Sequence, residues 1–254
     1  MNFFTQGPDP VLGTWVSIPH HAVIENMAQS GFDFLLLDGE HAPIAPTALG
    51  DLLTAAERHG ARTVYRVPAQ RDEYIKAALD AGVSGVMVPM VNGADEAQAV
   101  VAAGRYPPLG QRGIGPWRAS NYFQDYDAYL ASVNDQQAII VQIETATAVE
   151  QASAIAAVEG IDVLYVGPAD LASNLGYPIG ASSPEFLDVC EHVAKAANAK
   201  GKRAGIDIID ASAVPLFVER GFSLFTYGMD ATGIRESTDA AMGALRGTLD
   251  AGGA

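Results

Sequence analysis

Acidic side chains follow two successive apolar runs in the second half of the chain. Glu144 closes the run Ala138–Glu144, and Asp170 stands just after the run Val163–Gly167. If these runs form neighbouring parallel strands, about 4.8 Å apart, the two carboxylates can share one hard divalent cation and leave positions for substrate oxygens. Without a cation they would repel each other. The alternative is that Asp170 caps a helix beginning at Leu171.

An arginine and a histidine stand at comparable positions in the first half. Arg66 lies near the end of one apolar run, and His41 follows another, beside Asp38 and Glu40. Arginine binds a carboxylate or an enolate through two parallel hydrogen bonds, although a structural ion pair would use the same side chain. A histidine next to carboxylates suits proton transfer. The alternative for His41 is a loop histidine held by a backbone carbonyl.

Two kinds of covalent catalysis are disfavoured. None of the four lysines follows an apolar run; they are Lys76, Lys195, Lys200 and Lys202. A Schiff-base aldolase needs such a lysine. The single cysteine, Cys190, falls within a helical pattern and is expected in the core. An enolate would then be stabilised by a metal acting as a Lewis acid.

The elements that must position these residues alternate along the chain. Eight short runs rich in Val, Ile, Leu and Tyr predict buried strands: Leu12–Ser17, Phe32–Leu37, Arg62–Val67, Gly85–Pro89, Ala138–Glu144, Val163–Gly167, Arg203–Asp207 and Ser223–Gly228. Seven alanine-rich segments predict helices: Ala45–His59, Glu73–Ala81, Ala94–Ala103, Ala146–Val158, Pro184–Lys200, Ser212–Arg220 and Thr232–Leu249.

This alternation predicts an α/β fold, a closed (β/α)₈ TIM barrel formed by a single domain over residues 1–254. An open doubly wound sheet is the alternative, but no G-x-G-x-x-G follows the first strand. Barrels place their chemistry at the carboxyl ends of the strands, where the polar residues above would gather. The long connection between Gly104 and Gln137 is predicted to be a binding loop or an interface segment.

The composition of the chain disfavours certain classes of binding partner. Fifteen basic and 30 acidic residues give a formal charge of −15, which disfavours nucleic acid and anionic membranes as partners. One cysteine permits no internal disulfide, and we see no signal peptide and no long apolar run, so we expect a cytoplasmic protein without a membrane span. The strands seven and eight end in acidic and apolar residues, which disfavours a phosphorylated ligand.

Five motifs together carry a family resemblance. They occur in order as Leu37–Pro43, Arg112–Gly115, Arg118–Ser120, Gln142–Thr145 and Gly167–Leu171. The chain resembles, over nearly its whole length, the HpcH/HpaI aldolase family of metal-dependent, pyruvate-specific aldolases. The resemblance implies that Glu144 and Asp170 bind Mg²⁺, Mn²⁺ or Co²⁺, with no organic cofactor. It implies that the 2-keto acid is held by Gln142 and by the backbone around Gly167, Pro168 and Ala169.

The resemblance also implies roles for the first half of the chain. Arg66 would bind the substrate and stabilise the enolate. His41 would transfer protons, assisted by Asp38 and by Asp80 near a subunit contact, and Trp15 would form a wall of the pocket.

The implied activity is that of a class II aldolase, which reversibly cleaves 2-keto-4-hydroxy acids into pyruvate or hydroxypyruvate and an aldehyde. The family resemblance further implies a homohexamer, a trimer of dimers, with the last helix exchanged between subunits. Two alternatives remain: an acyl-CoA lyase of the citramalyl or malyl type, and a non-catalytic barrel that binds a small molecule.

Overall fold

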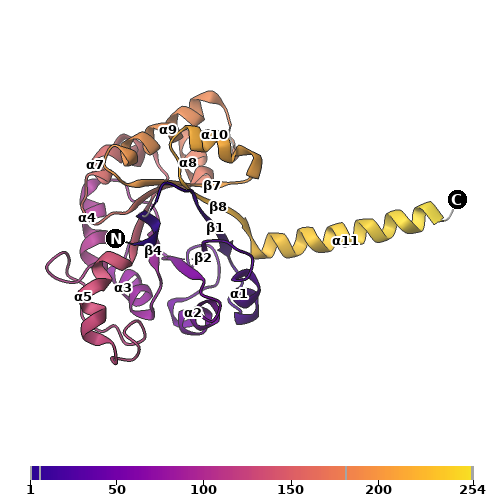
Figure 1. Ribbon diagram of the computed structural model, residues 1–254. Helices are drawn as coiled ribbons and strands as arrows, with labels where there is room; N and C mark the ends of the chain where they lie inside the picture. The colour runs from indigo at the N-terminus through magenta and orange to yellow at the C-terminus, as the bar shows by residue number, and fades with distance from the viewer. Residues whose placement is uncertain (1, 6, 181, 253–254) are drawn as a thin grey trace.

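Eight parallel strands close into a barrel in chain order in the computed structural model, which describes residues 2–5, 7–180 and 182–252 (Figure 1). The strands are β1 (Val11–Val16), β2 (Phe34–Asp38), β3 (Arg62–Arg66), β4 (Gly85–Val88), β5 (Ala138–Ile143), β6 (Val163–Val166), β7 (Arg203–Ile208) and β8 (Leu224–Met229). All eight predicted strands and the single-domain barrel are confirmed. Positions 1, 6, 181, 253 and 254 of the predicted domain lie outside the described residues.

Helices surround the barrel, except for the last one, α11. The helices are α1 (His21–Met27), α2 (Leu49–Glu57), α3 (Asp72–Ala81), α4 (Ala94–Gly104), α5 (Tyr126–Gln136), α6 (Ala146–Glu150), α7 (Ala152–Ala156), α8 (Pro168–Leu175), α9 (Pro184–Asn198), α10 (Val214–Glu219) and α11 (Asp230–Gly252). Three short 3₁₀ helices are η1 (Phe3–Thr5), η2 (Pro46–Ala48) and η3 (Ala211–Ala213). Each predicted helical segment contains an observed helix. The segment predicted as one helix at Ala146–Val158 is two helices that meet at Gln151.

Three helices were not predicted from the sequence: α1, α5 and α8. Helices α1 and α8 are short, with seven and eight residues, so they show little periodicity. Helix α5 buries only Val133, so it has no apolar stripe to reveal it within the long connection.

The core has two layers on either side of the sheet. Inside the barrel, side chains such as Phe34, Leu36 and Val64 pack against one another, and Phe4 of η1 closes this inner layer with its ring 5.2 Å from that of Phe34. Outside the barrel, the other face of each strand packs against the surrounding helices. The strands are therefore buried on both faces, as their continuous apolar runs predict.

The strand register brings distant polar residues together at the carboxyl ends. Asp38 of β2 pairs with Arg66 of β3, and Asp207 of β7 pairs with Thr226 of β8. The register between β1 and β8 shifts between Gly13 and Trp15, an irregularity that re-aims side chains at a barrel rim.

The last helix leaves the barrel. Figure 1 shows α11 projecting away from the other elements as one straight helix of 23 residues. Its exposed apolar side chains include Ile234, Met242, Leu245 and Leu249. In the part of the chain that the structure describes, no helix is both long and apolar enough to cross a membrane.

Candidate active site

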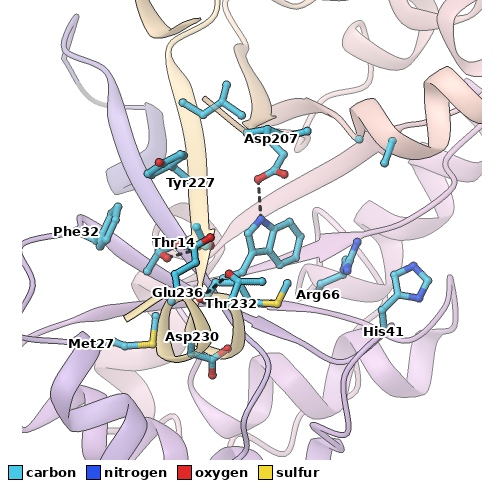
Figure 2. Close-up of a pocket in the computed structure, with 18 of the residues that line it drawn as sticks. Thr14, Met27, Phe32, His41, Arg66, Asp207, Tyr227, Asp230, Thr232 and Glu236 are labelled. Atoms are coloured by element: carbon cyan, nitrogen blue, oxygen red, sulfur yellow. Dashed lines mark hydrogen bonds between the residues drawn. The ribbon is translucent and has the colours of Figure 1, made fainter. Parts of the chain in front are cut away.

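A cavity of about 1220 Å³ opens at the carboxyl ends of the strands and continues along α11. Its lining includes nine of the predicted site residues: Trp15, His41, Arg66, Gln142, Glu144, Gly167, Pro168, Ala169 and Asp170. Figure 2 shows Arg66 and His41 on one side of this cavity, with Phe32, Met27 and Tyr227 on the opposite side. The fold thus gathers residues from both halves of the sequence around one space.

Arg66 is held rigidly where it meets the cavity. Its Nε and Nη2 donate hydrogen bonds of 2.9 and 2.8 Å to the two carboxylate oxygens of Asp38. Its Nη1 lies 3.3 Å from Glu40 Oε2, and its guanidinium carbon lies 4.4 Å from the centre of the Trp15 ring. Arg66 is therefore both ion-paired and part of the cavity wall, so the structural and substrate-binding interpretations of this arginine do not exclude each other.

Asp38 acts on Arg66 and on the backbone that follows β2. Its Oδ1 also accepts hydrogen bonds from the amides of Glu40 (3.0 Å) and His41 (3.2 Å). Burial would raise the pKa of Asp38, but Arg66 and these two amides outweigh burial and hold the pKa below its ordinary value. Asp38 therefore stays ionised and fixes the arginine and the start of the loop.

His41 reaches the cavity from that loop. Its side chain is 65% exposed, and its Nε2 lies 3.9 Å from Glu40 Oε2. Burial raises the pKa of Glu40, although Arg66 and His41 oppose this rise. Asp38 contacts the backbone amide of His41, so the two residues are linked through the loop.

Glu144 lines the cavity and is 3% exposed. Its Oε1 accepts a 2.6 Å hydrogen bond from Gln142 Nε2, and its Oε2 accepts a 3.1 Å bond from the amide of Met90. Met90 adopts a φ of 57°, which is uncommon for a non-glycine residue and turns its amide toward the glutamate. Burial raises the pKa of Glu144 to about 7, and repulsion from Asp170 and Glu40 adds to this rise.

Asp170 faces the same cavity from the first turn of α8. The helix begins at Pro168 and its N-cap is Gly167, so Asp170 is not the cap and the capping alternative is wrong. Gly167 has a second role, because a Cβ at this position would lie 2.3 Å from Glu144 Oε1. Only glycine therefore leaves room for the Glu144 carboxylate beside α8.

These residues fit a divalent cation with open coordination positions. Glu144 and Asp170 repel each other with no cation between them, and Gln142 Oε1 is buried without a hydrogen-bond partner within the described chain. Over residues 2–5, 7–180 and 182–252, no three His, Cys, Asp or Glu side chains form a ready-made metal centre. The protein would thus supply two carboxylates, and water or substrate oxygens would complete the coordination of a hard cation.

Asp80 is not brought to this cavity. It lies in α3, where its Oδ1 accepts hydrogen bonds from Arg112 Nε (3.1 Å) and Nη2 (2.5 Å) and from the hydroxyl of Tyr106 (3.4 Å). Arg112 also donates to Gln137 Oε1 at 2.9 Å, which anchors the long connection before β5. Within one subunit Asp80 therefore has a structural position, and its predicted assistance to His41 stays a prediction.

Sequence reasoning missed a polar network beneath Trp15. Trp15 Nε1 donates to Asp207 Oδ1 (2.8 Å) and to Thr226 Oγ1 (3.0 Å), and Tyr165 shares a 2.5 Å hydrogen bond with Thr226. The only sequence signal was the presence of Asp207 and Thr226 within otherwise apolar strands. Burial raises the pKa of Asp207, with Thr226, Trp15 and Arg66 opposing the rise.

Comparison with known proteins identifies the class of this barrel. Residues 12–236 match the HpcH/HpaI aldolase/citrate lyase family, and the chain belongs to that family. The predicted family membership is confirmed. The chain is an aldolase-type enzyme, a carbon–carbon lyase, as the sequence analysis expected.

Several relatives support this assignment. The chain is 44% identical over 222 residues to 4-hydroxy-2-oxovalerate aldolase from Novosphingobium aromaticivorans, covering 86% of this chain and 84% of the relative. It is 37% identical over 233 residues to 2-keto-3-deoxy-L-rhamnonate aldolase from Salmonella gallinarum, covering 91% and 87%. A crystal structure of an HpcH/HpaI aldolase/citrate lyase family protein from Burkholderia cenocepacia superimposes with a TM-score of 0.89 at 34% identity, covering 96% and 97%. Aldolase activity is thus better supported than the alternatives of an acyl-CoA lyase or a non-catalytic barrel.

Proposed function

We propose that this enzyme is a divalent-metal-dependent aldolase that reversibly cleaves 2-keto-4-hydroxy acids into an aldehyde and pyruvate or hydroxypyruvate. The observation that carries the proposal is the acidic pair Glu144 and Asp170, which has no ion-pair partner within 4 Å among the described residues and faces the same cavity as Arg66. Two aldolase relatives are each named after a 2-keto acid, and this supports a 2-keto acid as the substrate class.

The acidic pair would hold Mg²⁺, Mn²⁺ or Co²⁺, and no organic cofactor is required. When bound, the cation supplies Lewis-acid charge to the carboxylate and keto oxygens of the substrate. Gln142 positions Glu144 through its Nε2, and its Oε1 is buried with no hydrogen-bond partner among the described residues. The backbone from Gly167 to Ala169 forms the wall against which the keto acid would lie.

Arg66 would donate hydrogen bonds to the oxygen that gains negative charge as the carbon–carbon bond breaks. Asp38 and Trp15 hold the guanidinium in place before the substrate arrives, so little reorganisation is needed in the transition state. Such fixed donors are worth about 3–4 kcal/mol of transition-state stabilisation.

His41 would exchange the proton. In the cleavage direction His41 removes the proton from the C4 hydroxyl. The C3–C4 bond then breaks, and the electron pair of that bond stays with the keto acid, which becomes an enolate. The aldehyde leaves, and a proton added at C3 completes pyruvate or hydroxypyruvate. The exposed position of the His41 ring allows it to return its proton to water.

Metal removal tests this proposal. Pyruvate in D₂O should exchange its methyl protons when the enzyme and Mg²⁺ or Mn²⁺ are present, as followed by NMR. After chelation and dialysis the exchange should stop, and it should return when the cation is restored. Exchange that continues at the same rate in the chelated protein would refute the metal-dependent scheme.

We also propose that α11 packs on a neighbouring subunit in a homo-oligomer, with the hexamer as the expected assembly. The support is the projection of this helix away from its own barrel (Figure 1) and the exposed apolar residues Met242, Leu245 and Leu249 at helical spacing. Light scattering of the full chain and of a variant with these three residues changed to Ser would test it, because the variant should dissociate.

A further inference from the structure

The cavity has two chemically different sides. The donor side, defined as Arg66, Gln142, Glu144 and Asp170 with His41, carries the proposed keto-acid chemistry. The acceptor side, defined as Thr14, Met27, Phe32, Asp207 and Tyr227, comes from β1, the end of α1 and the loop that follows it, β7 and β8. Figure 2 shows Met27, Phe32 and Tyr227 across the cavity from Arg66 and His41, with Asp207 between the two groups. An aldehyde that reacts with the keto acid would contact the acceptor side.

Asp207 is the half-buried carboxylate of the acceptor side. Its Oδ1 accepts both internal hydrogen bonds, from Trp15 Nε1 at 2.8 Å and from Thr226 Oγ1 at 2.5 Å. In the described parts of the chain no group donates to Oδ2, although Asp207 lines the cavity. One oxygen of this carboxylate is therefore committed to the protein, and the other remains able to accept a hydrogen bond from a ligand.

The described residues around Asp207 include no free positively charged side chain that could pair with an anionic aldehyde. Among the described residues that line the cavity, Arg66 is the only lysine or arginine, and it is paired with Asp38 on the donor side. Asp230, also in the lining, accepts hydrogen bonds from Ser17 and from the amide of Ile18, which fix its position. A second carboxylate entering here would meet negative charge in a partly desolvated space.

We infer that Asp207 determines which aldehydes the enzyme accepts: its second oxygen takes a hydrogen bond from a hydroxyl group of the aldehyde, and its charge repels aldehydes that carry a carboxylate. This inference rests on the proposed aldolase function and narrows its substrate class to neutral, hydroxylated aldehydes. The apolar side chains of Met27 and Phe32 beside it suit the carbon chain of such a molecule.

The Asp207→Asn variant separates this role from a purely structural one. Asparagine keeps one oxygen that can accept from Trp15 and Thr226, so the network beneath Trp15 has the same acceptor. It replaces the second oxygen with an NH₂ group, which donates rather than accepts and carries no charge. Selectivity should therefore change in a predictable direction while the fold is retained.

Two matched pairs of aldehydes test the inference in aldol addition to pyruvate with saturating Mg²⁺. Acetaldehyde and glycolaldehyde differ by one hydroxyl group, and butanal and succinic semialdehyde differ by one carboxylate. The wild-type enzyme should prefer glycolaldehyde and butanal within their pairs by about tenfold in kcat/KM, the size expected for a hydrogen bond to a charged group. In Asp207→Asn both preferences should fall to less than about threefold.

Asp210→Asn is the matched control. Asp210 is exposed, caps η3 through Ser212, and is not part of the cavity lining, so the same change there should leave both preferences at their wild-type values. Methyl-proton exchange of pyruvate in D₂O is measured in parallel without aldehyde, because it reports the donor half-reaction alone.

The outcomes are distinct. If the wild-type enzyme exchanges no methyl protons, the proposed function itself fails. If exchange is normal but Asp207→Asn keeps both wild-type preferences, the role of Asp207 is overturned while the aldolase function stands. Should Asp207→Asn fail to fold, the wild-type measurement decides, because a wild-type preference for succinic semialdehyde over butanal contradicts the inference.

Discussion

The donor and acceptor sides of the cavity are built by different means. On the donor side, adjacent strands place charged side chains directly opposite each other, so that Arg66 is ion-paired with Asp38. The carboxylates of Glu144 and Asp170, in contrast, face the same cavity without an ion-pair partner among the described residues. On the acceptor side, the register between β1 and β8 shifts, and the wall consists of aromatic, apolar and hydroxyl groups around the half-buried carboxylate of Asp207. The donor side is thus specialised for charge, whereas the acceptor side is specialised for shape and for hydrogen bonding.

Trp15 connects the two sides. Its ring covers the Arg66 guanidinium, and its N–H is bonded to Asp207 and Thr226. Arg66 is therefore oriented from both directions, by Asp38 in the sheet and by a hydrogen-bond network whose other end belongs to the acceptor side.

The largest effect should come from Glu144→Gln. This change removes the buried charge that would bind the cation, so calorimetric titration with Mn²⁺ should show no binding, and kcat should fall by about a thousandfold or more. The exposed Glu150, at the end of α6, offers a control in Glu150→Gln, which should bind Mn²⁺ normally. Retained Mn²⁺ affinity in Glu144→Gln would place the cation elsewhere.

Arg66→Ala should follow in magnitude. Loss of a fixed donor on the developing negative charge is expected to lower kcat by about 100- to 1000-fold, while Mn²⁺ binding persists. Arg58→Ala, at a side chain that is 74% exposed, serves as the control. Near-normal turnover of Arg66→Ala would remove this arginine from the chemistry and leave it as a structural ion pair.

The stability of the cation-free protein should depend on pH through Glu144, a residue of the donor side. In the cation-free protein, burial raises the pKa of Glu144 from its ordinary value of 4.5 to about 7. Between these pH values the folded state holds a proton that the unfolded state has lost, so the free energy of unfolding falls as pH rises through this window, by about 3 kcal/mol in all. Denaturation of the chelated protein at pH 5 and pH 8 should show this loss, and Glu144→Gln should lack it. If Glu144→Gln lost as much unfolding free energy between pH 5 and pH 8 as the wild-type protein, Glu144 would not be the origin of this pH dependence.

Trp15→Phe should have the smallest effect. The variant keeps an aromatic face over Arg66 but loses the N–H that reaches Asp207 and Thr226, which should cost about 1–2 kcal/mol of stability. Turnover should fall only a few-fold, because Asp38 still holds the arginine. A loss of turnover as large as that of Arg66→Ala would show that the acceptor-side network, rather than Asp38, is the main support of the guanidinium.

The same contrast explains what could be predicted from the sequence. The strand containing Arg66 was predictable because a buried parallel strand is apolar throughout, and residues at strand ends reach the barrel mouth whatever the helices do. Thus Glu144, Asp170 and Arg66 were correctly expected to face one cavity.

The parts that were missed depend on tertiary packing. The roles of Asp207 and Thr226 follow from the register of β7 and β8, which no local pattern encodes. Helix α5 lacks an apolar stripe, and the pairing of Asp80 with Arg112, 32 positions apart, joins α3 to the long connection. The predicted exchange of α11 between subunits concerns contacts beyond one chain and stays a prediction.

The most direct test of the central claim is anomalous diffraction from a crystal of the protein soaked with Mn²⁺ and pyruvate. We expect one strong manganese peak contacted by the carboxylates of Glu144 and Asp170, with pyruvate oxygens bound to it and Arg66 facing the keto group. A cavity with no manganese at these two carboxylates, in a crystal that binds pyruvate there, would contradict this claim.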